Sequence, residues 1–276
     1  MVVVYESDFI KVHVHSNAPG KVLQMALRLG EIDHLKVDNL REQNRQMLEE
    51  RKRNEKEFGL IAVSAGAGID ELFRVLSVDA LISGGQTMNP SIETIAAAIN
   101  KVNARNIFIL PNNSNIILAA QEASHLTDKN VVLLPTKTIP QGIAACMAYS
   151  PDETLENNEA AMREALAGVV SGAVTYAVRE SQFEGRKIQE GDLIGLMDNR
   201  IAAVADSVDG AALALLDKMI EKKGAKDCSV SIYYGESLDE DNASALASEV
   251  EARYPDADVI AQSGGQALYY YYLAVE

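Results

Sequence analysis

The chain has 276 residues, 47% of them hydrophobic, and its 40 acidic and 25 basic side chains give a net charge of −15. This length fits roughly two domains. The negative charge opposes binding to nucleic acid and to anionic membranes. The sequence has no signal-peptide pattern and no apolar run of the ~18 residues that a membrane span needs. Its two cysteines do not form a disulfide framework. We therefore expect a cytoplasmic protein that neither binds nucleic acid nor inserts into a membrane.

The first residues, "MVVVYESDFIKVHVH", predict a β-hairpin that turns at residues 6–8. His13 and His15 lie two residues apart in the second strand, so both imidazoles are expected on one face. They are either part of a metal site or a solvated strand face. A two-stranded hairpin is marginal in water without neighbouring strands. We therefore expect the chain to be a fragment of a longer polypeptide.

The next segment predicts two helices with a short strand between them. Pro19 is suited to the first turn of a helix that Gly30 ends, and "HLKVDN" is typical of a short strand. A second helix is expected to start at Asp38 or Asn39, and its nearly uniform polarity indicates a surface or bridging helix. Together, residues 1–57 are interpreted as a truncated α+β domain and a connecting helix.

From Phe58 the pattern changes to short apolar runs that alternate with helices: "GLIAVSA", "VDALISG", "NIFILP" and "NVVLLP". Such runs predict parallel strands covered on both faces. After Ser150 the order of elements becomes less regular. The predicted fold class is α/β, with a parallel layer unit at 58–150 and a mixed α+β unit at 151–276.

The loops after the predicted strands are the candidate binding site, because ligands of open α/β sheets gather beyond the carboxyl ends of the strands. These loops are rich in Gly, Asn, Ser and Thr, whose amides and hydroxyls can hold a carboxylate or phosphate oxygen. Tight turns and helix N-caps use the same residues, and this interpretation stays open. The candidates are Thr87, Asn89, Ser91, Asn112, Asn113, Thr136 and Gln141.

Searches for known catalytic motifs are negative. The sequence has no G-x-x-x-x-G-K-[ST], no complete dinucleotide-binding glycine pattern, no H-E-x-x-H and no C-x-x-C. "SAGAGID" lacks the third glycine and a phosphate-binding lysine. Cys146 is expected in the core, with no partner that would make it a thiolate. No catalytic residue is predicted from the residues alone.

Several motifs, in order along the chain, resemble the catalytic subunit of bacterial fatty acid kinase, of the dihydroxyacetone-kinase-like group. They are "KVHVHSNAPGKVLQMALRLGEIDHLKVDNLREQ", "VSAGAGIDELFRVL", "GGQTMNPSIETIAAAINKV", "LPNNSNIILAAQEA", "LPTKTIPQGIAA" and "GGQALYYYYLAVE". The resemblance implies a dimerising middle domain and a C-terminal region that is similar to DegV-type fatty-acid-binding proteins. In that family a separate N-terminal domain binds ATP and magnesium, and nothing in this sequence resembles it.

The resemblance implies that the chain is the non-catalytic part of a kinase, with roles in dimerisation and carrier docking. The whole enzyme would phosphorylate the carboxyl group of a fatty acid that a DegV-like carrier presents. In the family, the two histidines of "HVH", here His13 and His15, bind zinc together with a cysteine from an earlier strand. Neither Cys146 nor Cys228 matches that cysteine. We therefore expect two of three zinc ligands, with weak zinc binding or none.

Two other functions are alternatives to a role as part of a fatty acid kinase. One is a free-standing DegV-like fatty-acid-binding protein, in which Thr87 and Ser91 would hold the carboxylate. This chain has no match for the basic or histidine residue that lies on the far wall of the fatty acid site in those proteins. In addition, "LYYYY" places bulky rings where the acyl chain needs room. The other is a sugar kinase component related to dihydroxyacetone kinase, which anchors its substrate through a histidine. No histidine of this chain fits that pattern.

Overall fold

The computed structural model describes residues 1–6, 9–85, 89–224 and 228–276. The chain divides into two compact units, Met1–Asn54 and Glu55–Glu276. The domain boundaries expected near residues 57 and 150 stay a prediction.

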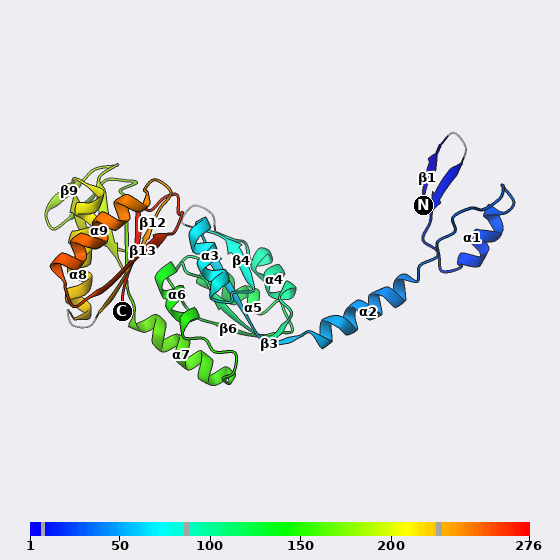
Figure 1. Cartoon of the computed structure of the whole chain (residues 1–276), viewed down its shortest axis with the longest axis horizontal. Coiled ribbons are helices and arrows are strands. Elements are labelled where there is room, and N and C mark those ends of the chain that lie inside the picture. The colour runs from blue at the N-terminus through cyan, green and yellow to red at the C-terminus, as the bar shows by residue number, and fades with distance from the viewer. Residues whose placement is uncertain (7–8, 86–88, 225–227) are drawn as a thin grey trace. The chain divides into compact units, whose positions relative to one another are not determined.

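The unit Met1–Asn54 consists of a hairpin and two helices (Figure 1). β1 (Val2–Tyr5) and β2 (Ile10–His13) pair antiparallel, which agrees with the predicted hairpin. Its other elements are α1 (Pro19–Ala26) and α2 (Leu40–Arg53). None of the residues described in this unit is buried. The unit therefore has secondary structure without a core.

Two local predictions in this unit have different outcomes. Asn39 is the N-cap of α2, and its side chain accepts hydrogen bonds from the backbone N–H groups of Arg41 and Glu42. The short strand predicted for "HLKVDN" is wrong, because residues 34–39 are irregular. His34 has φ +52°, a left-handed conformation that interrupts an extended run, and its ring lies 2.9 Å from the Asp33 carboxylate.

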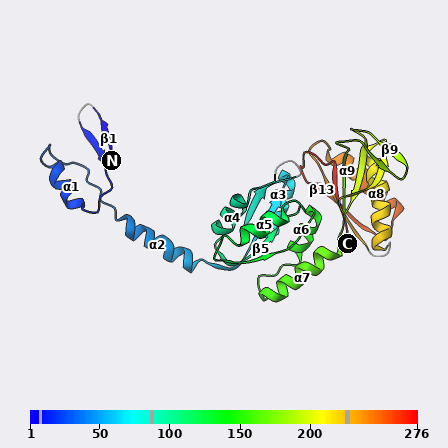
Figure 2. The same ribbon diagram turned by 180° about the vertical axis from the view of Figure 1, so that it is seen from behind.

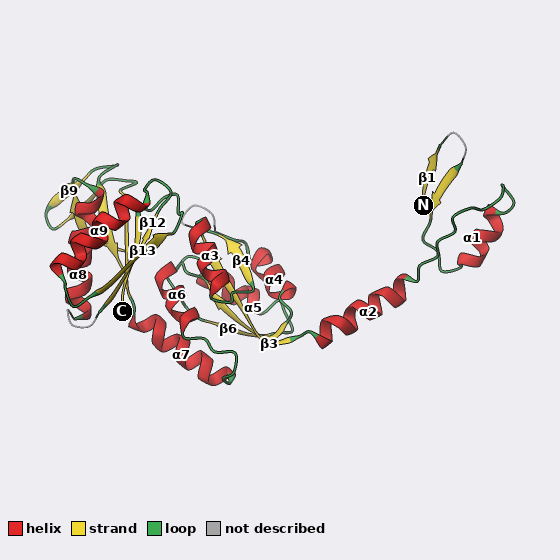
Figure 3. Ribbon diagram, in the orientation of Figure 1, coloured by secondary structure: helices red, strands yellow, loops and turns green. Residues whose placement is uncertain are grey.

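A four-stranded parallel sheet forms the first half of Glu55–Glu276 (Figure 3). Its strands follow the order β4-β3-β5-β6, and the apolar runs predicted all four of them. The bounds are β3 (Lys56–Ser64), β4 (Ala80–Ser83), β5 (Ala104–Leu110) and β6 (Asn130–Leu133), with α3 (Ala67–Val75), α4 (Ile92–Lys101), α5 (Ile117–Ser124) and α6 (Ile139–Met147) between or after them. β4 and β5 lie on opposite sides of β3, so the strand order reverses at β3.

Both faces of this sheet are buried, as the unbroken apolar strands predicted. Leu60 and Ala62 pack on the side of α3 and α6, whereas Ile61 and Val63 pack on the side of α4 and α5. This alternation follows from the two-residue period of a strand. The sheet is a platform whose carboxyl edge carries the candidate loops.

The second half is a six-stranded mixed sheet that α7 (Leu155–Gly168) precedes. Its strand order is β11-β10-β7-β14-β12-β13, and only β12 and β13 run parallel. The bounds are β7 (Val170–Tyr176), β10 (Leu193–Met197), β11 (Arg200–Ala205), β12 (Ser229–Tyr234), β13 (Asp258–Ser263) and β14 (Tyr271–Val275), with α8 (Val208–Lys223) and α9 (Glu240–Arg253). Side chains of α8 and α9 pack into one core with this sheet, and both helices are visible in the reverse view (Figure 2).

The structure also contains a small hairpin that the sequence did not predict, β8 (Ser181–Phe183) with β9 (Arg186–Ile188). Glu184 and Gly185 connect the strands with φ of +48° and +81°. Two residues with positive φ are typical of the tight turn that suits a twisted hairpin. Strands of three residues are too short for a hydrophobic period to reveal them.

The predicted fold class is confirmed: the unit combines a parallel α/β layer with a mixed sheet. Contacts between the two halves include a small cluster of Ala144, Val169 and Ala274. No helix within the described part of the chain is long and apolar enough to cross a bilayer.

Candidate functional site

A cavity of about 50 Å³ lies between the two sheets of Glu55–Glu276. The parallel sheet contributes residues from the carboxyl ends of β3, β4 and β5, together with the loop after β6. The mixed sheet contributes residues of β7, β10 and β14 and their neighbouring loops. The cavity therefore lies at the point where the strand order reverses, which is the usual ligand position in open α/β sheets.

Asn112 follows β5 and is fixed in position by three contacts. Its backbone N–H donates to Thr136 Oγ1 at 3.0 Å, and its Nδ2 donates to the backbone oxygen of Val63 at 2.8 Å. Its Oδ1 lies so close to Gly142 that a Cβ at that glycine would be 2.1 Å away. Oδ1 is buried and accepts no hydrogen bond from the residues that the structure describes. The φ of +54° is one that asparagine tolerates better than most residues. Asn112 thus joins β3, β5 and α6.

The predicted residues beside Asn112 serve mainly as local structure. Thr136 is fully buried behind Asn112. Asn113 lines the cavity and accepts a hydrogen bond from the Asn115 backbone N–H at 2.9 Å. Gln141 accepts one from the Lys137 backbone N–H at 2.8 Å. Asn112 and Asn113 therefore reach the cavity, and the other two support its wall.

The loop after β4 supplied three more predicted residues, and the structure does not bring those it describes to the cavity. Thr87 lies outside the described residues. Ser91 is the N-cap of α4 and accepts a hydrogen bond from the Thr94 backbone N–H at 3.2 Å. Asn89 is exposed and does not line the cavity. For Ser91, the structure agrees with the helix-capping role that the sequence left open.

Sequence reasoning missed several residues that line the cavity. They are Lys137, Thr138, Ser171 and Asn199, whereas the bulky rings expected from "LYYYY" are present as Tyr269 and Tyr272. The hydroxyls of Thr138 and Ser171 are 2.7 Å apart and connect the two halves of the unit. Lys137 and Thr138 lie within the "LPTKTIPQG" loop and could have been selected from it. Ser171 and Asn199 come from the mixed sheet and its loops, and nothing local in the sequence marks them.

The two tyrosines restrict the size of the cavity. Their ring centroids are 4.8 Å apart. Burial, and secondarily the neighbouring Tyr269, raise the pKa of Tyr272 above its ordinary value, so this phenol stays neutral. Pockets for drug-sized ligands usually measure ~300–1,000 Å³. A cavity of about 50 Å³ holds a few waters or one compact polar group, and it has no room for a long hydrocarbon chain.

The "SAGAG" loop at 64–68 does not form a phosphate cradle, because the "SGGQ" loop at 263–266 packs against it. Gly66 has φ +121°, and a Cβ there would lie 2.4 Å from the backbone oxygen of Gly264. The Ile69 backbone N–H at the start of α3 donates to that same oxygen at 3.0 Å. A carbonyl thus occupies the space that a phosphate would need, and the glycines permit this close backbone contact.

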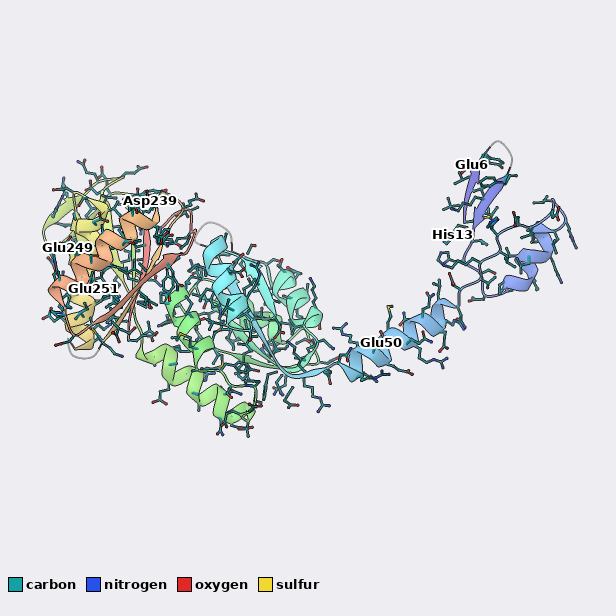
Figure 4. All side chains as sticks on the ribbon, viewed as in Figure 1. Glu6, His13, Glu50, Asp239, Glu249 and Glu251 are labelled. Atoms are coloured by element: carbon teal, nitrogen blue, oxygen red, sulfur yellow. The ribbon has the colours of Figure 1, made fainter. Side chains whose placement is uncertain are left out.

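The imidazoles of His13 and His15 face each other in the unit Met1–Asn54. Their Nε2 atoms are 2.9 Å apart, although β2 already ends at His13. Figure 4 labels His13. Two nitrogens on one tetrahedral zinc lie roughly 3.3 Å apart, given Zn–N bonds of ~2.0–2.1 Å. The two nitrogens are therefore at hydrogen-bond distance, closer together than two zinc ligands would be. Among the described residues, no group of three or more His, Cys, Asp or Glu side chains comes together.

The two cysteines belong to the interior of the fold. Both are buried and free. Burial raises the pKa of the Cys146 thiol from 9.0 to about 12, so the thiol stays protonated at neutral pH. The prediction of a buried Cys146 is confirmed.

Comparison with known families assigns almost the whole chain. Residues 59–276 match the C-terminal domain of the FakA-like fatty acid kinase family, and residues 1–47 match the middle domain of the same family. Protein YloV of Bacillus subtilis (strain 168) is 38% identical over 284 residues, which cover 100% of this chain and 51% of that protein. The chain thus spans about half the length of the curated relatives it matches.

Solved structures share the fold at low sequence identity. DegV, a fatty acid binding protein from Bacillus subtilis, has a TM-score of 0.57 at 11% identity and covers 80% of this chain and 99% of its own. The Streptococcus pneumoniae Fatty Acid Kinase (Fak) B3 protein loaded with linoleic acid gives 0.54 at 10%, covering 79% and 98%. The dihydroxyacetone kinase of C. freundii gives 0.56 at 12%, covering 88% and 57%. At these identities the likeness is one of fold alone.

Proposed function

Because the chain belongs to the FakA-like fatty acid kinase family, we propose that it is the part of a fatty acid kinase that docks a DegV-like carrier and supports dimerisation. The carrier presents a fatty acid whose carboxyl group is phosphorylated. In this proposal ATP and magnesium bind to another part of the whole protein. The relatives are about twice as long as this chain, which leaves room for such a domain.

One observation carries the proposal: Glu55–Glu276 has the fold of fatty-acid-binding proteins, but its cavity at the carboxyl ends of the parallel strands is about 50 Å³. A region with the carrier fold, whose cavity between the two sheets has no space for an acyl chain, is suited to contact a carrier rather than act as one. Phosphoryl transfer depends on bringing the acceptor into register with the nucleotide. A docking surface for the loaded carrier supplies that register.

The excess of acidic side chains indicates how the carrier would be attracted. Asp239, Glu249 and Glu251 are exposed carboxylates at or on α9 (Figure 4). A carrier that presents basic side chains would associate faster because of this charge, and salt would slow the association.

Calorimetric titration of the chain with fatty-acid-loaded carrier tests the docking proposal. We expect saturable binding at low salt and weaker binding at high salt, and a carrier of unrelated fold serves as control. Absence of binding at low salt, while the whole kinase binds, would place the docking surface elsewhere.

A fatty-acid-binding function is the second candidate, because DegV-type proteins of known structure share the fold. The volume of the cavity opposes it. Mass spectrometry of an organic extract separates the two functions. If the chain docks a carrier, we expect no co-purified fatty acid. A stoichiometric amount of fatty acid would favour the fatty-acid-binding function.

For zinc, we propose weak binding through His13 and His15, which supply two of the three ligands that the family uses. Their Nε2 atoms lie side by side, which supports a shared ion in place of the hydrogen bond between the two rings. The purified chain is expected to lose zinc to a mild chelator, and to retain less of it after His13→Ala. Zinc that is held tightly and stoichiometrically by the chain alone would contradict this.

A further inference from the structure

The charge around the cavity between the two sheets differs from that of the rest of the chain. Acidic residues outnumber basic ones by 40 to 25 overall, yet none of the described residues that line the cavity is Asp or Glu. Lys137 is the one basic residue among them. It is exposed and forms no ion pair with any residue that the structure describes. A basic residue therefore borders the cavity, and no carboxylate in the described part of the protein pairs with it.

Hydrogen-bond donors also face this space. Asn113 is 7% exposed, and its Oδ1 accepts from the Asn115 backbone N–H, which leaves its Nδ2 group to donate to a ligand. Thr138 and Ser171 share one hydrogen bond of 2.7 Å, in which only one hydroxyl donates. The proton of the other hydroxyl remains available. These donors come from both halves of the unit.

The helix α6 strengthens the same preference for negative charge. Thr138 is its N-cap, and both Thr138 and Ile139 line the cavity. The N-terminus of a helix carries partial positive charge and favours anions. Asn112 holds the neighbouring loop through its bonds to Val63 and Thr136, so little has to be ordered when a ligand enters.

We propose that this cavity is a binding site for one small oxyanion, either a phosphate or the carboxylate of a short acid. Lys137 supplies the charge, Asn113 and the hydroxyl pair of Thr138 and Ser171 supply hydrogen bonds, and Tyr269 and Tyr272 limit the size. The volume of about 50 Å³ admits the head group and no long chain. The inference does not depend on carrier docking.

Titration of the 276-residue chain with inorganic phosphate, and separately with acetate, butyrate and decanoate, tests the proposal by calorimetry at constant ionic strength. We expect saturable binding of phosphate, of the short acids, or of both, which identifies the source of the oxyanion. Affinity should not rise from acetate to decanoate. The proposal would be overturned if neither phosphate nor the short acids bound saturably, or if affinity grew with the length of the acid's hydrocarbon chain.

The variant Lys137→Gln should weaken binding by about tenfold or more, the range of one hydrogen bond to a charged group. Lys187→Gln is the matched control, because Lys187 is exposed, lies on β9 and does not line the cavity. Asn113→Asp replaces a donor with a negative charge and should abolish binding, with the thermal midpoint recorded to verify folding. Equal affinities in Lys137→Gln and Lys187→Gln would contradict the assignment.

Discussion

The units Met1–Asn54 and Glu55–Glu276 use apolar residues in opposite ways. β1 and β2 contain Val2, Val4, Ile10 and Val12, and all four are exposed. β3 and β5 contain similar residues that are buried on both faces of a sheet. The difference is one of neighbours, because a hairpin alone cannot cover its faces, whereas a sheet between helices can. Stability therefore resides in the second unit, while the first offers surface for association.

Separating the two units at residue 54 should have the largest effect. We expect Glu55–Glu276 to unfold in one cooperative transition with nearly the midpoint of the whole chain. Met1–Asn54 should show no cooperative transition, because none of its described residues is buried. Circular dichroism during thermal denaturation measures both. A cooperative transition in the isolated first unit would contradict the comparison.

A matched pair of phenylalanine substitutions sharpens the comparison. Phe108 is 0% exposed in the parallel sheet, and Phe108→Ala should lower the free energy of unfolding by ~3–5 kcal/mol. Phe9 is 57% exposed, and Phe9→Ala should leave that free energy within ~0.5 kcal/mol. Urea denaturation of the whole chain gives both values. Equal effects would show that the first unit has a core of its own.

Glycine substitutions provide a smaller contrast. A Cβ at Gly142 would lie 2.1 Å from Asn112 Oδ1, so Gly142→Ala should cost ~1–3 kcal/mol through overpacking. Gly20 in α1 has nothing within 4 Å of a Cβ. Gly20→Ala should therefore leave the main unfolding transition unchanged. If Gly142→Ala proved as stable as the natural chain, the position assigned to Asn112 would be wrong.

We expect the smallest effect from the buried thiol of Cys146, which should lower the free energy of unfolding at alkaline pH. The pKa of Cys146 is about 12 in the folded chain against an ordinary value of 9.0. Between these values the unfolded state loses a proton that the folded state retains, so the free energy of unfolding falls as pH rises. Cys146→Ala should reduce this slope. An unchanged slope in the variant would contradict the burial of the thiol.

The sequence predicted the elements of Glu55–Glu276 well, because a fully buried strand needs an unbroken apolar run and its loops need Gly, Asn or Pro. It did not predict the composition of the cavity. Ser171 and Asn199 reach the cavity only because the mixed sheet packs beside the parallel one, and such packing leaves no local pattern. The prediction for "HLKVDN" failed for a different reason: residues 34–39 pair with no strand among the described residues, and His34 has φ +52°.

Hydrogen–deuterium exchange of the whole chain, with and without the fatty-acid-loaded DegV-like carrier, tests the central claim most directly. Backbone amides that the carrier covers exchange more slowly. Exchange measured for each peptide of the chain shows whether these amides belong to Met1–Asn54 or to Glu55–Glu276. The account predicts slower exchange within Glu55–Glu276 when loaded carrier is present, and no change with a protein of unrelated fold. Protection confined to Met1–Asn54, or the absence of any protection, would contradict it.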